Sequence, residues 1–144
     1  MLEVDNVTYV VDENLLRLGA GLVAVRKDTA RFGRAPIDDI LPLGILDTDW
    51  IPIVGRRGWI VITNDRHLRT RPVEAELAIA HKLKVVHLHG KVGGQSAWAQ
   101  LTRLTARWPA IENQHEKAPE GPWWFSVRSS GTAVMEFAPG TVER

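Results

Sequence analysis

The 144-residue chain is 44% hydrophobic and 24% charged, which excludes a wholly disordered protein and suffices for one domain, over residues 1–144, with one hydrophobic core. It has no cysteine, no long apolar run and an acidic start, so we expect a cytoplasmic protein without disulfides, thiolate metal sites, a membrane span or a secretory signal. The net charge of +1 excludes a polycation, so contact with nucleic acid requires a local basic patch.

The first 46 residues predict two strands separated by a helix. An apolar run over residues 9–14 ends abruptly in polar groups, which is typical of a strand. Apolar residues at helical spacing predict a helix over residues 15–26, with Asn14 as its N-cap. Residues 29–32 form a brief second strand in this interpretation, and the glycines and prolines of residues 33–46 indicate a loop.

A second helix and a strongly apolar strand follow. The helix is predicted to have Asp47 at its N-cap, Pro52 in its first turn and Gly58 as its stop signal. The continuous β-branched run over residues 59–63 is typical of a strand that is covered on both faces.

The second half of the chain continues the alternation of strands and helices. Its predicted elements are a helix opened by Pro72, a strand over 84–89, a helix over 95–108, a polar linker over 112–121 and a β-hairpin over 123–137. In the helix over 95–108, Trp98 is predicted to lie on the same face as Leu101, Leu104 and Trp108. Alternating elements with short connections predict an α/β fold, in which helices cover both faces of a mostly parallel sheet.

Acidic residues gather where the predicted strands end. Asp12 and Glu13 close the first strand, Asp65 closes the 59–63 strand, and Asp47 and Asp49 begin the helix between them. Ligands of open parallel sheets bind at the carboxyl ends of the strands. Hard cations such as Mg²⁺ and Mn²⁺ prefer carboxylate and water oxygens. The pattern therefore predicts a metal site that activates water against a phosphodiester.

Each of these acids also has a purely structural interpretation. Asp47 is suited to cap a helix, Asp49 to sit favourably in its first turn, and Asp65 to form a turn. Packing alone does not explain why acids from two separate strand ends should meet, which favours the metal site.

Basic residues are predicted beside this acidic edge. Arg66, Arg69 and Arg71 follow Asp65 closely, and Arg56 lies earlier in the chain. The planar guanidinium group binds phosphate through two hydrogen bonds at once. These arginines are therefore candidates for RNA binding, and a solvated loop is the alternative.

Two histidines lie on the strand predicted for residues 84–89. His87 and His89 are two residues apart, so both side chains point to one face of that strand. Paired imidazoles bind Zn²⁺ or Ni²⁺, but the sequence offers no obvious third ligand.

Three motifs resemble a known family. The sequence V-V-D-E-N-L at residues 10–15, D-T-D-W-I at 47–51 and V-I-T-N-D-R at 61–66 resembles the PIN-like domain group that includes VapC-type ribonuclease toxins. The nearest resemblance is to the branch with DEN-L and T-N-D motifs, and it covers roughly the first 90 residues.

This resemblance implies a three-layer α/β/α sandwich and an endoribonuclease that depends on Mg²⁺ or Mn²⁺. It places the first metal-binding acid at Asp12, the strand-end acid at Asp65, and the helix-start acid at Asp47 or, two residues on, Asp49. Glu13 is a further candidate ligand. Polar residues that orient the carboxylates or the attacking water would be Asn14, Thr63 and Asn64.

The chain departs from the ordinary pattern because no fourth acid matches late in the sequence. The resemblance also implies a small antitoxin protein as partner, and a homodimer.

Three hypotheses remain open on the sequence alone. The first is a metal-dependent endoribonuclease that serves as the toxin of a type II toxin–antitoxin pair. The second is a catalytically silent PIN-like module that binds a protein, which the incomplete acid set and the six tryptophans favour. The third is a phosphoacceptor receiver domain with an acidic pocket around Asp12.

Overall fold

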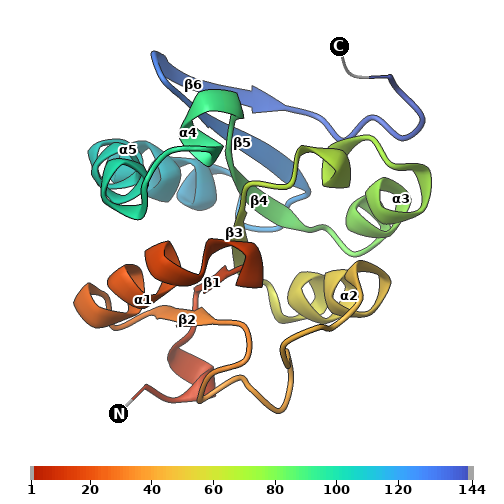
Figure 1. The fold of residues 1–144 in the computed structure, drawn as a ribbon. Helices are drawn as coiled ribbons and strands as arrows, with labels where there is room; N and C mark the ends of the chain where they lie inside the picture. Colours follow the sequence, from red (N-terminus) through yellow and green to blue (C-terminus); the bar gives the residue numbers. More distant parts are fainter. Residues whose placement is uncertain (1, 143–144) are drawn as a thin grey trace.

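The computed structural model describes residues 2–142 and contains a six-stranded sheet between two layers of helices (Figure 1). The strand order is β2-β1-β3-β4-β5-β6, and every neighbouring pair is parallel except the antiparallel hairpin β5–β6. The predicted α/β fold with a C-terminal hairpin is confirmed. The strands are β1 (Tyr9–Val11), β2 (Thr29–Arg31), β3 (Ile60–Thr63), β4 (Lys84–Leu88), β5 (Trp123–Arg128) and β6 (Gly131–Met135).

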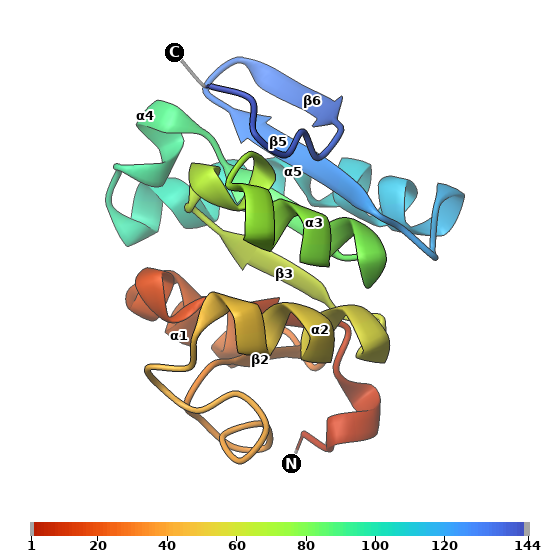
Figure 2. The same cartoon turned by 90° about the vertical axis from the view of Figure 1, so that its right-hand side faces the viewer.

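The helices cover both faces of the sheet. Helices α2 and α3 lie on one face, in front of the sheet in Figure 2, and α1, α4 and α5 lie on the other. Each face buries its own apolar cluster. The helices are α1 (Leu16–Val25), α2 (Asp47–Arg57), α3 (Pro72–Ala80), α4 (Gly90–Gly93) and α5 (Ala97–Lys117), with short 3-10 turns η1 (Val4–Asn6), η2 (Glu13–Leu15) and η3 (Arg66–Arg69).

The order in which the chain adds strands to the sheet reverses at β1, while β1 and β3 themselves run parallel. From β1 the chain moves to β2 on one side, and it then crosses through α2 to β3 on the other side. The carboxyl ends of β1 and β3 therefore form the switch point of this sheet, where connecting segments diverge and leave space for a ligand. Asp12 follows β1 at this point, and Asp65 follows β3 two residues after its end.

A row of buried polar residues crosses the carboxyl end of the sheet on the α2 and α3 face. Val10, Val61 and Val85 belong to the core on that face, and side chains two residues apart on a strand share a face. Thr63 lies opposite His87 in the parallel register. The members of this polar row, from β1 to β5, are Asp12, Thr63, His87 and Ser126, all buried.

Three details of the predicted helix ends are corrected. Asp47 is the first residue of α2 and Leu46 is its N-cap, while Pro52 lies at the sixth position, inside the helix. Asn14 lies within η2, and the helix that follows has no side-chain cap. Gly58 does end α2, because its φ of 71° is the left-handed conformation that glycine adopts without strain.

Helix α5 is longer than predicted. It continues to Lys117, so the first half of the expected polar linker is helical. Trp98 is 77% exposed, whereas Leu104, Trp108 and Ile111 face the sheet. Trp98 precedes Leu104 by six residues, which places it about 120° around the helix from the buried face. Within residues 2–142 no helix is both long and apolar enough to cross a membrane.

Candidate metal site and nucleic-acid interface

Asp12 is held in place by the end of the neighbouring strand. Its side chain is 8% exposed, and its Oδ2 accepts a hydrogen bond of 2.8 Å from the Thr63 hydroxyl. That hydroxyl oxygen also accepts a bond of 3.1 Å from the backbone N–H of Asp65. Because a hydroxyl has one proton to donate, Thr63 gives it to Asp12 and links the ends of β1 and β3 through one side chain.

The electrostatic surroundings of Asp12 are unfavourable to its charge. Burial raises the pKa of Asp12 above its ordinary value of 3.8, and hydrogen bonds from Thr63 and the Asn14 backbone lower it by less. The negative charges of Asp47 and Asp65 raise this pKa further. The Asp12 carboxylate therefore faces two negative charges, one from α2 and one from beyond the end of β3, and a bound cation would relieve that repulsion.

The raised pKa of Asp12 predicts how stability depends on pH without metal. Ionising Asp12 is less favourable in the folded state than in the unfolded state, so the protonated side chain favours folding. This contribution to stability is complete below about pH 3.8 and is lost as pH rises through the higher folded pKa. We expect the Tm of Asp12→Asn, relative to wild type, to rise from pH 4 to pH 8 in EDTA. A difference in Tm that stays constant or shrinks over this range would contradict the assignment.

Asp47 and Asp65 also make local contacts. Asp47 Oδ1 accepts a hydrogen bond of 2.8 Å from the Trp50 indole N–H. Asp65 Oδ1 accepts one of 2.9 Å from the His67 backbone N–H and so caps η3. The local role expected of Asp65 in a turn is therefore present, whereas Asp47 accepts the Trp50 indole bond and does not cap α2. Each contact uses one oxygen of a two-oxygen carboxylate, so it is compatible with metal binding by the other.

The donor set fits a hydrated hard cation. In the part of the chain that the structure describes, no three acidic or histidine side chains are arranged closely enough to enclose an ion. Mg²⁺ does not need such a cage, since it keeps several waters and uses one or two carboxylates. Asp12 together with Asp47 or Asp65 supplies ligands of that kind and number. The charges of Asp47 and Asp65 act on Asp12, although the three carboxylates do not enclose an ion.

Comparison with known proteins bears on this arrangement. A family model described as a PIN like domain matches residues 7–90. The chain belongs to the PIN-like domain family. The match runs from two residues before β1 to two residues after β4 and contains all three acids, which favours this family over a receiver domain. Comparisons with curated proteins and with solved structures gave no match.

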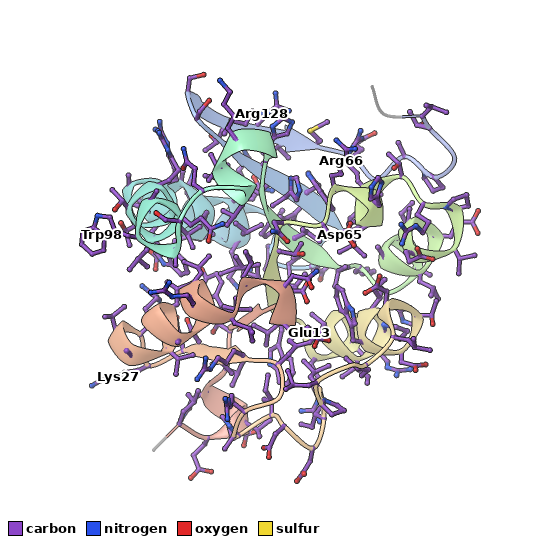
Figure 3. The ribbon with its side chains drawn as sticks, in the orientation of Figure 1. Glu13, Lys27, Asp65, Arg66, Trp98 and Arg128 are labelled. Atoms are coloured by element: carbon purple, nitrogen blue, oxygen red, sulfur yellow. The ribbon has the colours of Figure 1, made fainter. Side chains whose placement is uncertain are left out.

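The two alternative acids of this PIN-like domain have different surroundings. The Glu13 carboxylate accepts bonds of 3.0 and 3.2 Å from the Gly44 backbone N–H, which ties the 33–46 loop to η2. Figure 3 shows Glu13 and Asp65 near the middle of the same view. Asp49 is exposed and lies about 200° around α2 from Asp47, so Asp47 is the helix acid that acts on Asp12.

The two asparagines of the PIN-like motifs turn away from Asp12. The Asn64 amide donates a bond of 3.3 Å to the carbonyl of Gly93, the last residue of α4. The Asn14 side chain is exposed, and the residue approaches Asp12 through its backbone N–H. Thr63 is therefore the polar side chain that fixes the orientation of Asp12.

The predicted RNA-binding arginines of the PIN-like domain are only partly brought together. Arg66 is exposed immediately after Asp65, and Arg69 Nη1 donates a bond of 2.9 Å to the Glu136 carbonyl. Arg71 pairs with Glu74 at 3.2 Å. Arg56 lies near the end of α2, about 14 Å along the helix axis from Asp47, and therefore towards the opposite end of the sheet.

The two histidines contribute to a pocket that sequence analysis missed. The His87 and His89 rings meet edge to face with centroids 6.1 Å apart. They line a pocket of about 150 Å³ together with Arg66, Arg69, Gly90, Trp124 and Met135. These residues come from η3, β4, the start of α4, β5 and β6, so only the folded chain brings them together. A polar residue that continues an apolar face, as His87 follows Val85, was the available signal.

Proposed function

We propose that this PIN-like domain is a metal-dependent endoribonuclease that hydrolyses RNA phosphodiesters. The observation that supports it most directly is the buried Asp12 carboxylate, held by Thr63 at the switch point of the sheet and repelled by Asp47 and Asp65. Nuclease activity is typical of PIN-like domains, and the matched region contains these residues.

The proposal assigns a separate role to each group of residues: metal binding, positioning of a ligand and contact with phosphate. Asp12, with Asp47 or Asp65, would hold Mg²⁺ or Mn²⁺, which supplies an activated water and positive charge at the phosphate. Thr63 holds one oxygen of Asp12, so that the other oxygen is presented in a fixed orientation. Arg66, exposed next to Asp65, is placed to contact phosphate oxygens of the RNA backbone.

The proposed biological role rests on the resemblance of the three sequence motifs to VapC-type toxins. We propose that the protein acts in the cytoplasm as the VapC-type toxin of a type II toxin–antitoxin pair, inhibited by a small antitoxin, and that it forms a homodimer. Exposed apolar side chains support a protein partner close to the acidic edge, because Leu43 and Leu46 lie in the segment leading to Asp47 and Leu16 begins α1.

A catalytically silent PIN-like module is the second candidate. It is favoured by the absence, among residues 2–142, of three acids or histidines arranged to enclose an ion. Under this alternative the exposed apolar side chains bind a partner and the acids have no catalytic task.

A cleavage assay separates the two candidates. Purified wild-type protein is incubated with an end-labelled single-stranded RNA in Mn²⁺, in Mg²⁺ and in EDTA. The nuclease proposal expects internal cuts with either metal and none in EDTA. Intact RNA under all three conditions, across several unrelated RNA sequences, would support the silent module.

Metal binding has a readout that needs no RNA. At Mn²⁺ one hundred times above its Kd, binding to the folded state adds about 2.7 kcal/mol, or roughly 5–10 °C in Tm for a chain of this size. We expect this rise in wild type and in Asp5→Asn, whose exposed acid lies in η1, and not in Asp12→Asn. An equal rise in Asp12→Asn would place the ion elsewhere.

A further inference from the structure

The small pocket between η3 and the carboxyl ends of β4 and β5 has the chemistry of an anion site. Its lining residues include Arg66, Arg69, His87 and His89, all of which carry nitrogen donors in their side chains. Among the described residues, none of the seven that line it carries a carboxylate. The local charge is therefore opposite in sign to that of the neighbouring acidic edge.

The size of the pocket limits what it can hold. Its volume of about 150 Å³ is below the roughly 300 Å³ at which pockets begin to enclose a drug-sized molecule. A phosphate group fits this space, whereas a base with its sugar does not. Trp124 is 2% exposed, so the indole forms part of the wall and does not offer a face for base stacking.

The pocket belongs to the same edge of the sheet as the acids. His87 lies opposite Thr63, the residue that holds Asp12, in the register of β4 and β3. Strands β1 and β4 are two positions apart in the sheet, a separation of about 10 Å. Figure 3 shows Arg66 beyond Asp65, on the side of β6. A single strand that contacts Asp12 can therefore reach the pocket.

We propose that this pocket binds a second phosphate group of the RNA, away from the one that is cut, and so sets the register of the strand on the enzyme. The inference rests on the proposed ribonuclease function and adds His87, His89 and the wall from β5 and β6 to the binding surface. The phosphate is either an internal phosphodiester or a terminal 5′-phosphomonoester, since both offer the same oxygens.

Binding without cleavage tests the pocket. A 12-nucleotide single-stranded RNA, fluorescently labelled at its 3′ end, is titrated with protein in EDTA, with either a 5′-hydroxyl or a 5′-phosphate. The variants are Arg66→Gln and His89→Gln, both at exposed side chains. Lys27→Gln is the matched control for Arg66→Gln, because it removes one exposed positive charge but lies far from Arg66 in Figure 3.

We expect Arg66→Gln to weaken the Kd about tenfold and to reduce its logarithmic salt dependence by about 0.7. His89→Gln should weaken binding in the same direction, and Lys27→Gln by less than about twofold. Equal losses for both RNAs identify an internal phosphodiester, and a loss confined to the phosphorylated RNA identifies a terminal phosphate.

Two outcomes overturn the inference: wild-type protein that does not bind either RNA, and pocket variants that bind no more weakly than Lys27→Gln. A wild-type protein that binds through the pocket but never cuts RNA in Mn²⁺ would instead refute the ribonuclease proposal and leave the pocket assignment standing. Tm values of all variants, within about 3 °C of wild type, confirm that the comparison is between folded proteins.

Discussion

Replacing Asp12 with asparagine is expected to lower metal-dependent RNA cleavage by at least about 100-fold while the protein stays folded. The amide has nearly the same shape, and its oxygen can still accept the Thr63 hydrogen bond, but it has no negative charge to hold a cation. Loss of a residue that merely supports a metal ligand already costs about 10- to 100-fold, so loss of a ligand should cost at least the upper value.

Initial rates at saturating Mn²⁺ measure this effect, with Asp5→Asn as a matched control at an exposed acid in η1. Asp65→Asn should show a comparable loss of cleavage, since it also removes a negative charge from the acidic edge. The variant should stay folded, because its amide oxygen can still cap η3 through the His67 N–H. Wild-type rates in both purified variants would remove the acidic edge from the mechanism. The proposed function would fall with it.

Replacing Thr63 with valine is expected to affect stability and activity together. Valine keeps the shape of the side chain but removes the hydroxyl that joins Asp12 Oδ2 to the Asp65 N–H. Thr63 is fully buried, so the change leaves polar groups without a partner at a cost of about 1–3 kcal/mol. Cleavage should fall by about 10- to 100-fold, since the orientation of Asp12 is no longer fixed.

Thr63→Ser separates the two effects of this change. Serine retains the hydroxyl and loses only a methyl group, so it should restore most of the cleavage rate while stability is still reduced. Urea denaturation gives the free energy of unfolding, and a Mn²⁺ titration of the rate shows whether metal affinity has changed. If Thr63→Val cuts RNA at the wild-type rate, its hydroxyl does not position Asp12 for catalysis.

The order of strands and helices was predictable because the relevant signals are local. The 59–63 run is continuously apolar and β-branched, as a covered strand must be, and β3 lies there. The extent of α5 was not predictable in the same way. Beyond Ile111 its inward positions include Gln114, a polar residue that is nonetheless buried, so the hydrophobic period that reveals a helix fades before the helix ends.

The site was predictable only where backbone geometry decides it. Parallel strands end at one edge, which brings Asp12 and Asp65 together whatever their side chains do. Partner choice depends on tertiary contacts, so the sequence did not indicate that Arg71 would pair with Glu74 or that Asn64 would bond to the Gly93 carbonyl. Arg56 lies at the opposite end of α2 from Asp47 because the helix runs away from the acidic edge. The spacing of arginines in the sequence does not indicate this distance.

The hairpin has a consequence for any attempt to shorten the protein. The family match ends at Gly90, yet β5 pairs with β4 along five residues and covers an edge that would otherwise offer bare N–H and C=O groups. A fragment cut at that boundary would retain every acid discussed above and still be prone to aggregate through its newly open strand. A shortened version must therefore retain β5 and β6.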